Sequence, residues 1–387
     1  TAPGSVTSSA GSSPTLAERH LHIVSFDVPS PPDYGGVIDV YHKAAALAEL
    51  GVRVHLHCYT YGRKPAEELD RFCASVHYYP RSTSKHLLFS SLPYVVVSRR
   101  SDELLDRLAQ DEHPILFEGL HSCYFLGDPR LAGRRRLVRT HNVEHDYYDA
   151  LAKAERGTFK RTYFTQEARK LKRFEPVLSE ADALLAISPN DQAYFAAHFP
   201  RVVHVPAFHP SARVDVPGGL GRFCLYHGAL SVPENDQAAL YLVNEVFNEL
   251  PVPLVIAGSG ASKELRAAVA GSTNVKLREN IPTAEITELV RQAQVNVLPT
   301  FQATGIKLKL LLCLFTGRHV VCNSPMVKDT GLEDLCLVHD DPEHMRLSIQ
   351  ACMAKPANGS TLERRITVLE ERFSNRRNAQ AIVDLLR

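Results

Sequence analysis

The sequence predicts an α/β protein built from two Rossmann-like, doubly wound parallel-sheet domains that face each other across a cleft. Short apolar runs alternate with segments of helical periodicity along most of the chain. One stretch rich in proline and glycine, 206–221, interrupts this alternation between two such series. A length of 387 residues, with 44% hydrophobic and 22% charged residues, also suits two globular domains better than one.

These breaks divide the chain into five parts. Residues 1–19 are rich in Ser, Ala, Thr, Gly and Pro and lack the pattern of a signal peptide, so we expect a tail or linker. We expect the first domain at 20–205, the interdomain linker at 206–221, the second domain at 222–360 and one or two terminal helices at 361–387.

The first domain starts with a strand–loop–helix–strand unit, the building block of a parallel sheet. The expected strands of this domain are 22–26, 52–56, 115–119, 136–140 and 181–188, and the expected helices are 37–50, 147–174 and one that Ser188 begins. The second domain repeats the pattern, with strands at 223–228, 254–258, 275–277, 295–299 and 319–322 and helices at 235–250, 263–270, 283–293 and 310–315.

Composition excludes two classes of protein. A net charge of +1 argues against a nucleic-acid binder with a generally basic surface. No apolar run approaches the roughly 18–20 residues needed to cross a bilayer. The eight cysteines are scattered without a C-x-x-C pair, which is typical of reduced thiols in a cytosolic protein. We therefore expect a cytoplasmic protein, with peripheral contact at the inner membrane face as an open possibility.

An anion-binding turn is expected at 300–309. Gly305 follows the strand at 295–299, and Lys307 and Lys309 enter the first turn of the next helix. Free backbone N–H groups, the helix dipole and two ammonium groups would converge there, as a diphosphate requires. The alternative is a simple turn followed by two solvated lysines.

A second approach to phosphate is possible at Gly35 and Gly36, in the loop after the first strand, because a backbone without side chains can come close to a ligand. The alternative for this pair is a tight turn without a ligand. His141 and Glu144 follow the strand at 136–140, where ligands of open α/β sheets bind. His141 and His145 have the spacing of zinc ligands, but the Glu does not stand where zinc proteases have it, so we predict no metal.

Residues 85–100 are basic at both ends and apolar between. This pattern suits a membrane surface or a lipid-linked acceptor. The alternative is a loop that leads into a core helix.

Several motifs, in order and spacing, resemble one known family. They are the Gly35–Gly36 loop, His141–Asn142, the Tyr226–Leu230 run with Pro233–Asn235, Ile256–Gly260, and Thr304–Lys309 continuing to Gly317–Val321. Together they resemble a GT-B-fold glycosyltransferase of the retaining family 4 type, also called the bacterial group 1 type, over nearly the whole chain after about residue 20.

The resemblance implies a nucleotide-sugar donor of UDP or GDP type on the second domain and a glycan, lipid-linked or other hydroxyl acceptor on the first. The terminal helices would cross back to the first domain. Thr304, Gly305, Ile306 and Lys307 would hold the diphosphate, with Gly35 and Gly36 approaching it; Gly228, Gly258 and Glu285 would lie towards the nucleotide. His141 would face the donor sugar, and Lys309 would stabilise the leaving diphosphate without a metal or other cofactor.

Two departures from the family pattern affect donor binding. Leu312 stands where the family has a glutamate that grips the donor ribose, and Thr304 stands where a partnering glutamate would be. A leucine cannot accept a hydrogen bond from a hydroxyl group. Glu234 also stands in the region where the family often has a lysine. Two alternatives therefore stay open: a catalytically degenerate partner or regulatory subunit, and a nucleotide-sugar epimerase that would use carboxylates such as Glu118 and Glu144.

Overall fold

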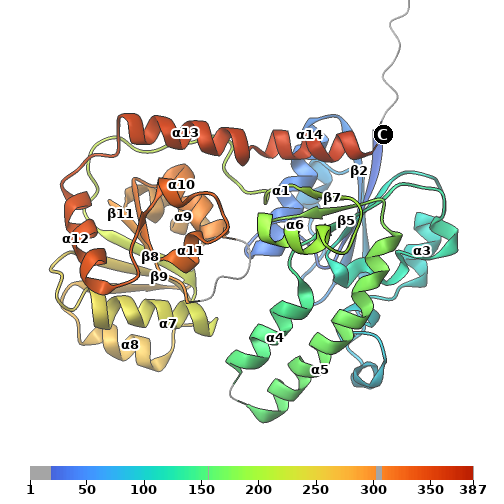
Figure 1. Ribbon diagram of the computed structural model, residues 1–387, viewed down its shortest axis with the longest axis horizontal. Helices are drawn as coiled ribbons and strands as arrows, with labels where there is room; N and C mark the ends of the chain where they lie inside the picture. The colour runs from blue at the N-terminus through green and yellow to red at the C-terminus, as the bar shows by residue number, and fades with distance from the viewer. Residues whose placement is uncertain (1–18, 156, 302–306, 387) are drawn as a thin grey trace, which may run out of the picture.

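A computed structural model describes residues 19–155, 157–301 and 307–386 of the chain. It contains two parallel sheets, each in its own lobe, with helices around both (Figure 1). The predicted fold class, two Rossmann-like parallel-sheet domains, is confirmed.

The first sheet has seven parallel strands in the order β3-β2-β1-β4-β5-β6-β7. Its strands are β1 (Arg19–Ser25), β2 (Val52–Thr60), β3 (Ser75–Pro80), β4 (Ile115–Glu118), β5 (Arg136–Thr140), β6 (Ala183–Ala186) and β7 (Val202–His204). The order reverses between β1 and β4, so the carboxyl ends of these strands form the crevice where ligands of such sheets bind.

The second sheet has six parallel strands in the order β10-β9-β8-β11-β12-β13, which repeats the arrangement of the first. Its strands are β8 (Cys224–Ala229), β9 (Leu254–Ser259), β10 (Val275–Glu279), β11 (Val295–Leu298), β12 (His319–Cys322) and β13 (Leu337–Val338). Here the reversal lies between β8 and β11, and β11 leads into the expected anion-binding turn.

Helices cover both sheets. Those of the first domain are α1 (Gly35–Glu49), α2 (Tyr94–Val97), α3 (Asp102–Leu108), α4 (Glu144–Ala154), α5 (Thr158–Phe174) and α6 (Pro189–Ala196). Those of the second are α7 (Pro233–Tyr241), continued by the π-helix η6 (Leu242–Val246), α8 (Lys263–Ala270), α9 (Thr283–Gln292), α10 (Leu308–Thr316), α11 (Ser324–Val327) and α12 (Pro342–Met353). The short 3₁₀ helices are η1 (Glu67–Arg71), η2 (Lys85–Phe89), η3 (Leu120–Phe125), η4 (Pro129–Leu131), η5 (Glu175–Glu180) and η7 (Glu333–Leu335).

One predicted element is wrong. The single helix expected at 147–174 is instead a hairpin of two packed helices, α4 and α5, that projects from the first domain (Figure 1). The Glu155 carboxylate accepts a hydrogen bond from the backbone N–H of Gly157 at 2.8 Å, which turns the chain between the helices. Ser188, by contrast, begins α6 as predicted, since its hydroxyl accepts from the backbone N–H of Asp191.

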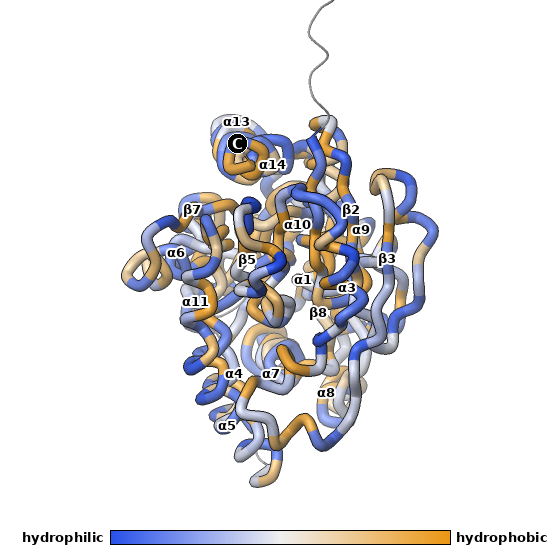
Figure 2. The backbone as a smooth tube through the Cα atoms, turned by 90° about the vertical axis from the view of Figure 1, so that its right-hand side faces the viewer, coloured by the Kyte–Doolittle hydropathy of each residue, from blue (hydrophilic) through white to orange (hydrophobic). Residues whose placement is uncertain are grey.

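Apolar side chains pack on both faces of each sheet, and the apolar stretches run through the interior in Figure 2. The terminal helices α13 (Ser360–Arg372) and α14 (Asn375–Leu385) run along one side of both lobes. In α14, Ile382 and Val383 are buried with Val40 and Leu47 of α1, so the end of the chain completes the core of the first domain.

The chain crosses between the domains twice, and the two crossings are joined. His209 Nε2 donates to the carbonyl of Phe373 at 2.7 Å, and Asn375 Nδ2 donates to the carbonyl of His209 at 2.6 Å. These hydrogen bonds hold the two crossings together.

Candidate functional site

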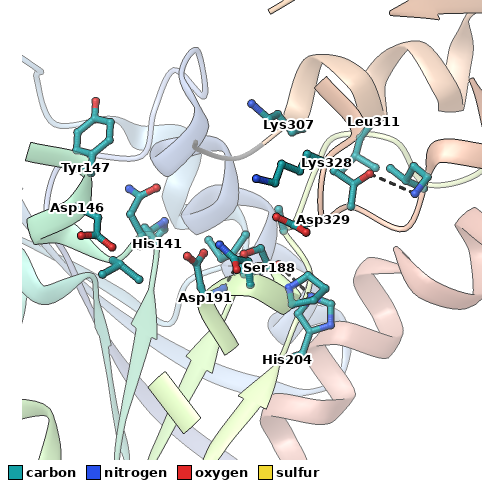
Figure 3. A pocket seen from close by; sticks show the side chains of 18 of the residues that line it. His141, Asp146, Tyr147, Ser188, Asp191, His204, Lys307, Leu311, Lys328 and Asp329 are labelled. Carbon is teal, nitrogen blue, oxygen red and sulfur yellow. Dashed lines mark hydrogen bonds between the residues drawn. The ribbon is translucent and has the colours of Figure 1, made fainter. Parts of the chain in front are cut away.

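A cavity opens between the two domains (Figure 3). The first domain contributes residues that follow β5 and β6, among them His141, Tyr147 and Asp191; the second contributes Lys307 at the start of α10 and Lys328 after α11. In Figure 3 the two lysines extend from the second domain towards the side that carries His141 and Asp191. Cationic side chains of one domain thus face titratable side chains of the other.

His141 is held in one orientation by Glu118. The ring nitrogen Nε2 donates to Glu118 Oε2 at 3.0 Å, and both side chains are buried. The ring also meets Phe26 edge to face, with the ring centres 5.3 Å apart. Because a carboxylate only accepts hydrogen bonds, Nε2 is the donor in this pair, and Nδ1 of His141 has no hydrogen-bond partner among the described residues.

Behind His141 lies a fully buried network of charges. Lys43 Nζ is 2.7 Å from Asp39 Oδ2 and 2.8 Å from Glu118 Oε1. Arg139 donates to Asp39 Oδ1 at 2.9 Å. Burial would raise the pKa of Asp39, but Arg139 and Lys43 hold it well below its usual range. Two carboxylates are therefore balanced by two cations, as buried charges require.

The network reaches the interdomain linker. Arg139 donates to the carbonyls of Val205 and Pro206, and Asp39 Oδ1 accepts from the backbone N–H of Phe208 at 2.8 Å. The side chain that orients His141 is thus connected, through Lys43 and Asp39, to the first crossing between the domains.

Asp39, Glu118 and His141 each offer a ligand atom within 4.8 Å of the others. The Lys43 ammonium already lies between the two carboxylates, so this cluster is better described as an ion-pair network than as a metal site. The zinc arrangement of His141 with His145 does not form, because α4 begins only at Glu144 and His145 points to Glu175, with Nδ1 3.4 Å from its Oε2.

The lysines of the second domain are partly withdrawn from water. Burial lowers the pKa of Lys307, and it lowers the pKa of Lys309 to about 8, with Glu234 opposing the shift in both. Lys309 does not line the cavity; its ammonium donates to Asn235 Oδ1 at 2.8 Å and lies over the ring of Tyr226. Glu234 accepts from the hydroxyl of Thr300, so a carboxylate stands at the edge of this cationic region.

Thr304, Gly305 and Ile306 lie outside the described residues, so the predicted turn is defined only by its flanks. On one flank, Asn323 fixes Thr300 by two hydrogen bonds to its backbone, at 2.9 and 2.7 Å. On the other flank, α10 starts at Leu308, directly after Lys307.

Gly35 and Gly36 form the first turn of α1 and lie opposite this segment. A Cβ on Gly35 would come within 4.0 Å of Leu308 Cδ1, across the gap between the domains. A Cβ on Gly36 would meet Phe26 Cζ at 2.6 Å. Among the described side chains, none accepts a hydrogen bond from the backbone N–H groups at the start of α1, so these donors are available to a ligand.

The remaining predicted residues lie away from this cavity. Gly228 and Gly258 pair across β8 and β9, where a Cβ on Gly258 would meet the carbonyl of Gly228 at 2.0 Å. Gly228 also packs on Asn235, the partner of Lys309. Glu285, in the first turn of α9, pairs with Arg278 at the surface. Leu312 packs against the apolar cluster beside α10, in keeping with the lack of a polar group there.

Glu144 forms a second pair near His141, in which the carboxylate is buried and its partner His121 is half-buried. Its Oε2 lies 3.6 Å from His121 Nε2, and its Oε1 has no partner among the described residues. Burial raises the pKa of Glu144 to about 8 and keeps the pKa of His121 well below 6.5. Glu144 is therefore a protonated acid at neutral pH.

Sequence reasoning missed Lys43, Asp39 and Arg139, and also Lys328 and Asp329 of the cavity. The spacing of Asp39 and Lys43, four residues apart on an otherwise apolar helix, was a usable signal. Asp329 has φ of 60°, a left-handed conformation that is uncommon outside glycine. In the sequence, only the turn-like run Asp329–Thr330–Gly331 indicated an unusual backbone conformation at Asp329.

No family model matches the chain. A Klebsiella pneumoniae protein, an uncharacterized 44.6 kDa protein in the cps region, is 28% identical over 342 residues, which cover 82% of this chain and 87% of that protein.

Solved structures share the fold. Anabaena Alr3699/HepE, in complex with UDP and glucose, superposes with a TM-score of 0.64 at 12% identity, covering 95% of this chain and 99% of that one. The N-terminal domain of trehalose-6-phosphate phosphatase from Candida albicans gives 0.60 at 11% identity, covering 97% and 98%. A trehalose-6-phosphate synthase, studied with bisubstrate glycomimetics for glycosyltransfer with retention, gives 0.58 at 13% identity, covering 94% and 98%. The two-domain arrangement is that of the GT-B fold.

Proposed function

We propose that this chain is a glycosyltransferase that moves a hexose-type sugar from a nucleoside-diphosphate donor, of UDP or GDP type, to the hydroxyl of a glycan, lipid-linked or other acceptor. The observation that carries the proposal is the cavity between the domains, which Lys307 of the second domain and His141 of the first both line, with Gly35 at the start of α1 close to Leu308 of α10. The UDP in the Anabaena structure and the glycosyltransfer studied in the synthase support it.

In this proposal the donor diphosphate lies between α1 and α10. The ammonium group of Lys307 and the N–H groups of both helix starts would stabilise the negative charge that grows on the leaving diphosphate. Lys309, whose ammonium is bonded to Asn235 and does not line the cavity, would add its positive charge from behind. Fixed dipoles and ammonium groups supply this stabilisation without a metal ion. His141, oriented by Glu118, would contact a hydroxyl of the donor sugar.

Retention of configuration would follow from attack on the face that the diphosphate leaves. The acceptor oxygen forms its bond to the anomeric carbon as the carbon–oxygen bond to phosphate breaks, and the acceptor proton passes to a departing phosphate oxygen. We place the reaction in the cytoplasm. A lipid-linked acceptor would bring the peripheral membrane contact expected from 85–100.

A second candidate, a degenerate partner or regulatory subunit of the same fold, is favoured by two observations. Leu312 packs in an apolar cluster, and Glu234 places a negative charge beside the lysines. Both weaken the case for tight donor binding. The epimerase alternative loses support, because the Glu118 carboxylate is taken by Lys43 and His141 and is not available as a base.

Isothermal titration with UDP, GDP, UDP-glucose and GDP-mannose separates the two candidates. The transferase predicts saturable binding of one nucleotide class, lost or weakened roughly tenfold or more in Lys307→Ala. Lys276→Ala, an exposed lysine of β10, is the matched control. Absence of binding by every nucleotide and nucleotide sugar would favour the degenerate subunit.

A further inference from the structure

Two phenylalanines stand out on the surface of the first domain. Phe89, the last residue of η2, is 92% exposed, and Phe159, in the first turn of α5, is 84% exposed. Leu88 beside Phe89 is also exposed. Single apolar side chains on a surface are ordinary, but phenyl rings left almost wholly in water are costly unless they have a use.

The helix that carries Phe159 is strongly basic. The 17 residues of α5 (TFKRTYFTQEARKLKRF) include six Lys or Arg and one Glu. That glutamate, Glu167, is buried, accepts from the backbone N–H of Tyr94 at 2.6 Å and pairs with Lys170 at 3.0 Å. Five exposed cations of α5 form no ion pair with any described residue: Lys160, Arg161, Arg169, Lys172 and Arg173. The exposed side of α5 therefore carries uncompensated positive charge.

The two segments form one surface. Lys170 Nζ donates to the carbonyl of Leu88 at 2.9 Å, and the Glu167–Tyr94 hydrogen bond fastens the end of the same loop to α5. Figure 1 shows the α4–α5 hairpin at the end of the first domain that points away from α13 and α14, and Figure 2 shows the same from the side. We call η2 together with the exposed side of α5 the lipid-facing surface.

We propose that the lipid-facing surface binds an anionic phospholipid bilayer, with Phe89 and Phe159 entering the boundary between headgroups and acyl chains. The five arginines and lysines would lie over the lipid phosphates. Nucleic acid or an acidic protein would account for the cations but not for two solvated phenyl rings, whereas a bilayer surface takes both. Only the biological purpose of this binding rests on the proposed function: the bilayer contact would bring the cleft to an acceptor carried on a lipid.

Cosedimentation of the 387-residue chain with vesicles tests this proposal. One set contains phosphatidylcholine alone, and the other contains phosphatidylcholine with an equal part of phosphatidylglycerol. We expect binding to the anionic vesicles only, and release at high salt, because screening weakens the charge contribution. The double variant Phe89→Ser/Phe159→Ser and the quintuple variant with Gln at 160, 161, 169, 172 and 173 should each lower the partition coefficient roughly tenfold or more.

Matched controls separate this effect from general surface changes. Leu347→Ser replaces a 56% exposed apolar residue of α12, and Lys263→Gln/Lys276→Gln removes exposed charge from the second domain; both should bind as the parent does. Equal binding to both vesicle types, no binding to either, or binding unchanged in the double phenylalanine variant would overturn the proposal. Nucleotide titration without vesicles measures binding at the donor site independently of vesicle binding. Failure of one proposal can therefore be distinguished from failure of the other.

Discussion

His141 Nε2 donates a hydrogen bond to Glu118 Oε2 over 3.0 Å, and the same carboxylate pairs with Lys43. The two residues come from neighbouring strands, since β4 ends at Glu118 and His141 follows β5. Through Lys43, Asp39 and Arg139 the pair is tied to the linker at 205–208. A side chain of the cleft and the interdomain linker thus share one polar network.

Glu118→Gln should weaken the binding of a nucleotide sugar but not that of the free nucleotide. The amide loses the charge that fixes the proton on His141 Nε2, and in our proposal His141 contacts only the sugar. We expect a loss of roughly 1.5–3 kcal/mol, the scale of a hydrogen bond to a charged group. Titration of UDP-glucose against UDP measures the difference.

Because removing one member of a buried ion pair is destabilising, His141→Asn serves as a second variant that leaves Glu118 and Lys43 paired. Glu264→Gln, on the exposed side of α8, is the control. Equal losses for UDP and UDP-glucose would show that His141 does not contact the sugar.

Lys309 should make nucleotide binding depend on pH in the alkaline range. Burial lowers the pKa of Lys309 to about 8, so its ammonium loses its proton as the pH rises through that value. Affinity for UDP should therefore fall between pH 7 and 9. Lys309→Ala should weaken binding at pH 7 by roughly 1.5–3 kcal/mol.

Lys309→Arg retains the charge at all these pH values, so its affinity should change much less between pH 7 and 9. Calorimetry across this range measures the effect. Parallel pH profiles of Lys309→Arg and the parent protein would contradict the assignment.

Gly36→Ala should perturb the start of α1, whereas Gly35→Ala should be tolerated. The new methyl group at position 36 meets Phe26 Cζ at 2.6 Å, while at position 35 the nearest atom is 4.0 Å away. Phe26 is packed on His141, so the ring cannot move without disturbing that side chain. We expect Gly36→Ala to cost roughly 1–3 kcal/mol of unfolding free energy.

Chemical denaturation of both glycine variants provides the comparison. Equal stability of the two would mean that the ring of Phe26 can make room, and that Gly36 serves another purpose.

The sequence allowed the fold to be predicted because parallel sheets leave a strong linear signal. Apolar runs and helical segments alternate in both domains, and strand 136–140 and helix 263–270 occur at the predicted bounds. The break between α4 and α5 was missed, since one turn around Gly157 interrupts a pattern that is helical on both sides.

The site was harder to predict, because it depends on which strands are neighbours. Glu118 and His141 are 23 residues apart and meet only since β4 and β5 pair. Lys43 reads as an ordinary helix residue until Glu118 and Asp39 are placed around it. The cavity residues Lys328 and Asp329 follow the short helix α11. The hydrophobic periodicity of the sequence does not indicate that this helix lies at the cleft.

Glu144→Gln should stabilise the protein at alkaline pH. Burial raises the pKa of Glu144 to about 8, against 4.5 for an ordinary glutamate, so the folded state favours the protonated acid. The associated stability is fully present below pH 4.5 and is lost as the pH rises to 8. The amide cannot ionise, so the variant should gain roughly 2 kcal/mol or more over the parent at pH 8.5 and little at pH 5.

Thermal or urea unfolding at the two pH values measures this gain, with Glu264→Gln as the exposed control. A gain of the same size at pH 5 and pH 8.5 would refute the raised pKa.

Histidines on one face of the first sheet should make the protein sensitive to acid. His22 on β1 hydrogen-bonds His57 on β2 at 2.8 Å and Asp111 at 3.1 Å, and Arg134 also faces this group. Burial lowers the pKa of His22 to about 4, despite the opposing charge of Asp111. The folded state thus favours the neutral ring, and the stability this provides is present above pH 6.5 and lost as the pH falls towards 4.

Unfolding free energy should therefore drop between pH 6.5 and 4, with up to about 3 kcal/mol of the drop due to His22. His22→Gln cannot titrate, so its unfolding free energy should fall less steeply over this range, although its stability at pH 7 is lower because the bond to His57 changes. His86→Gln, at an exposed histidine of η2, should keep the slope of the parent. Urea unfolding at half-unit pH steps measures these slopes, and identical slopes for His22→Gln and the parent would show that His22 is not the group that titrates.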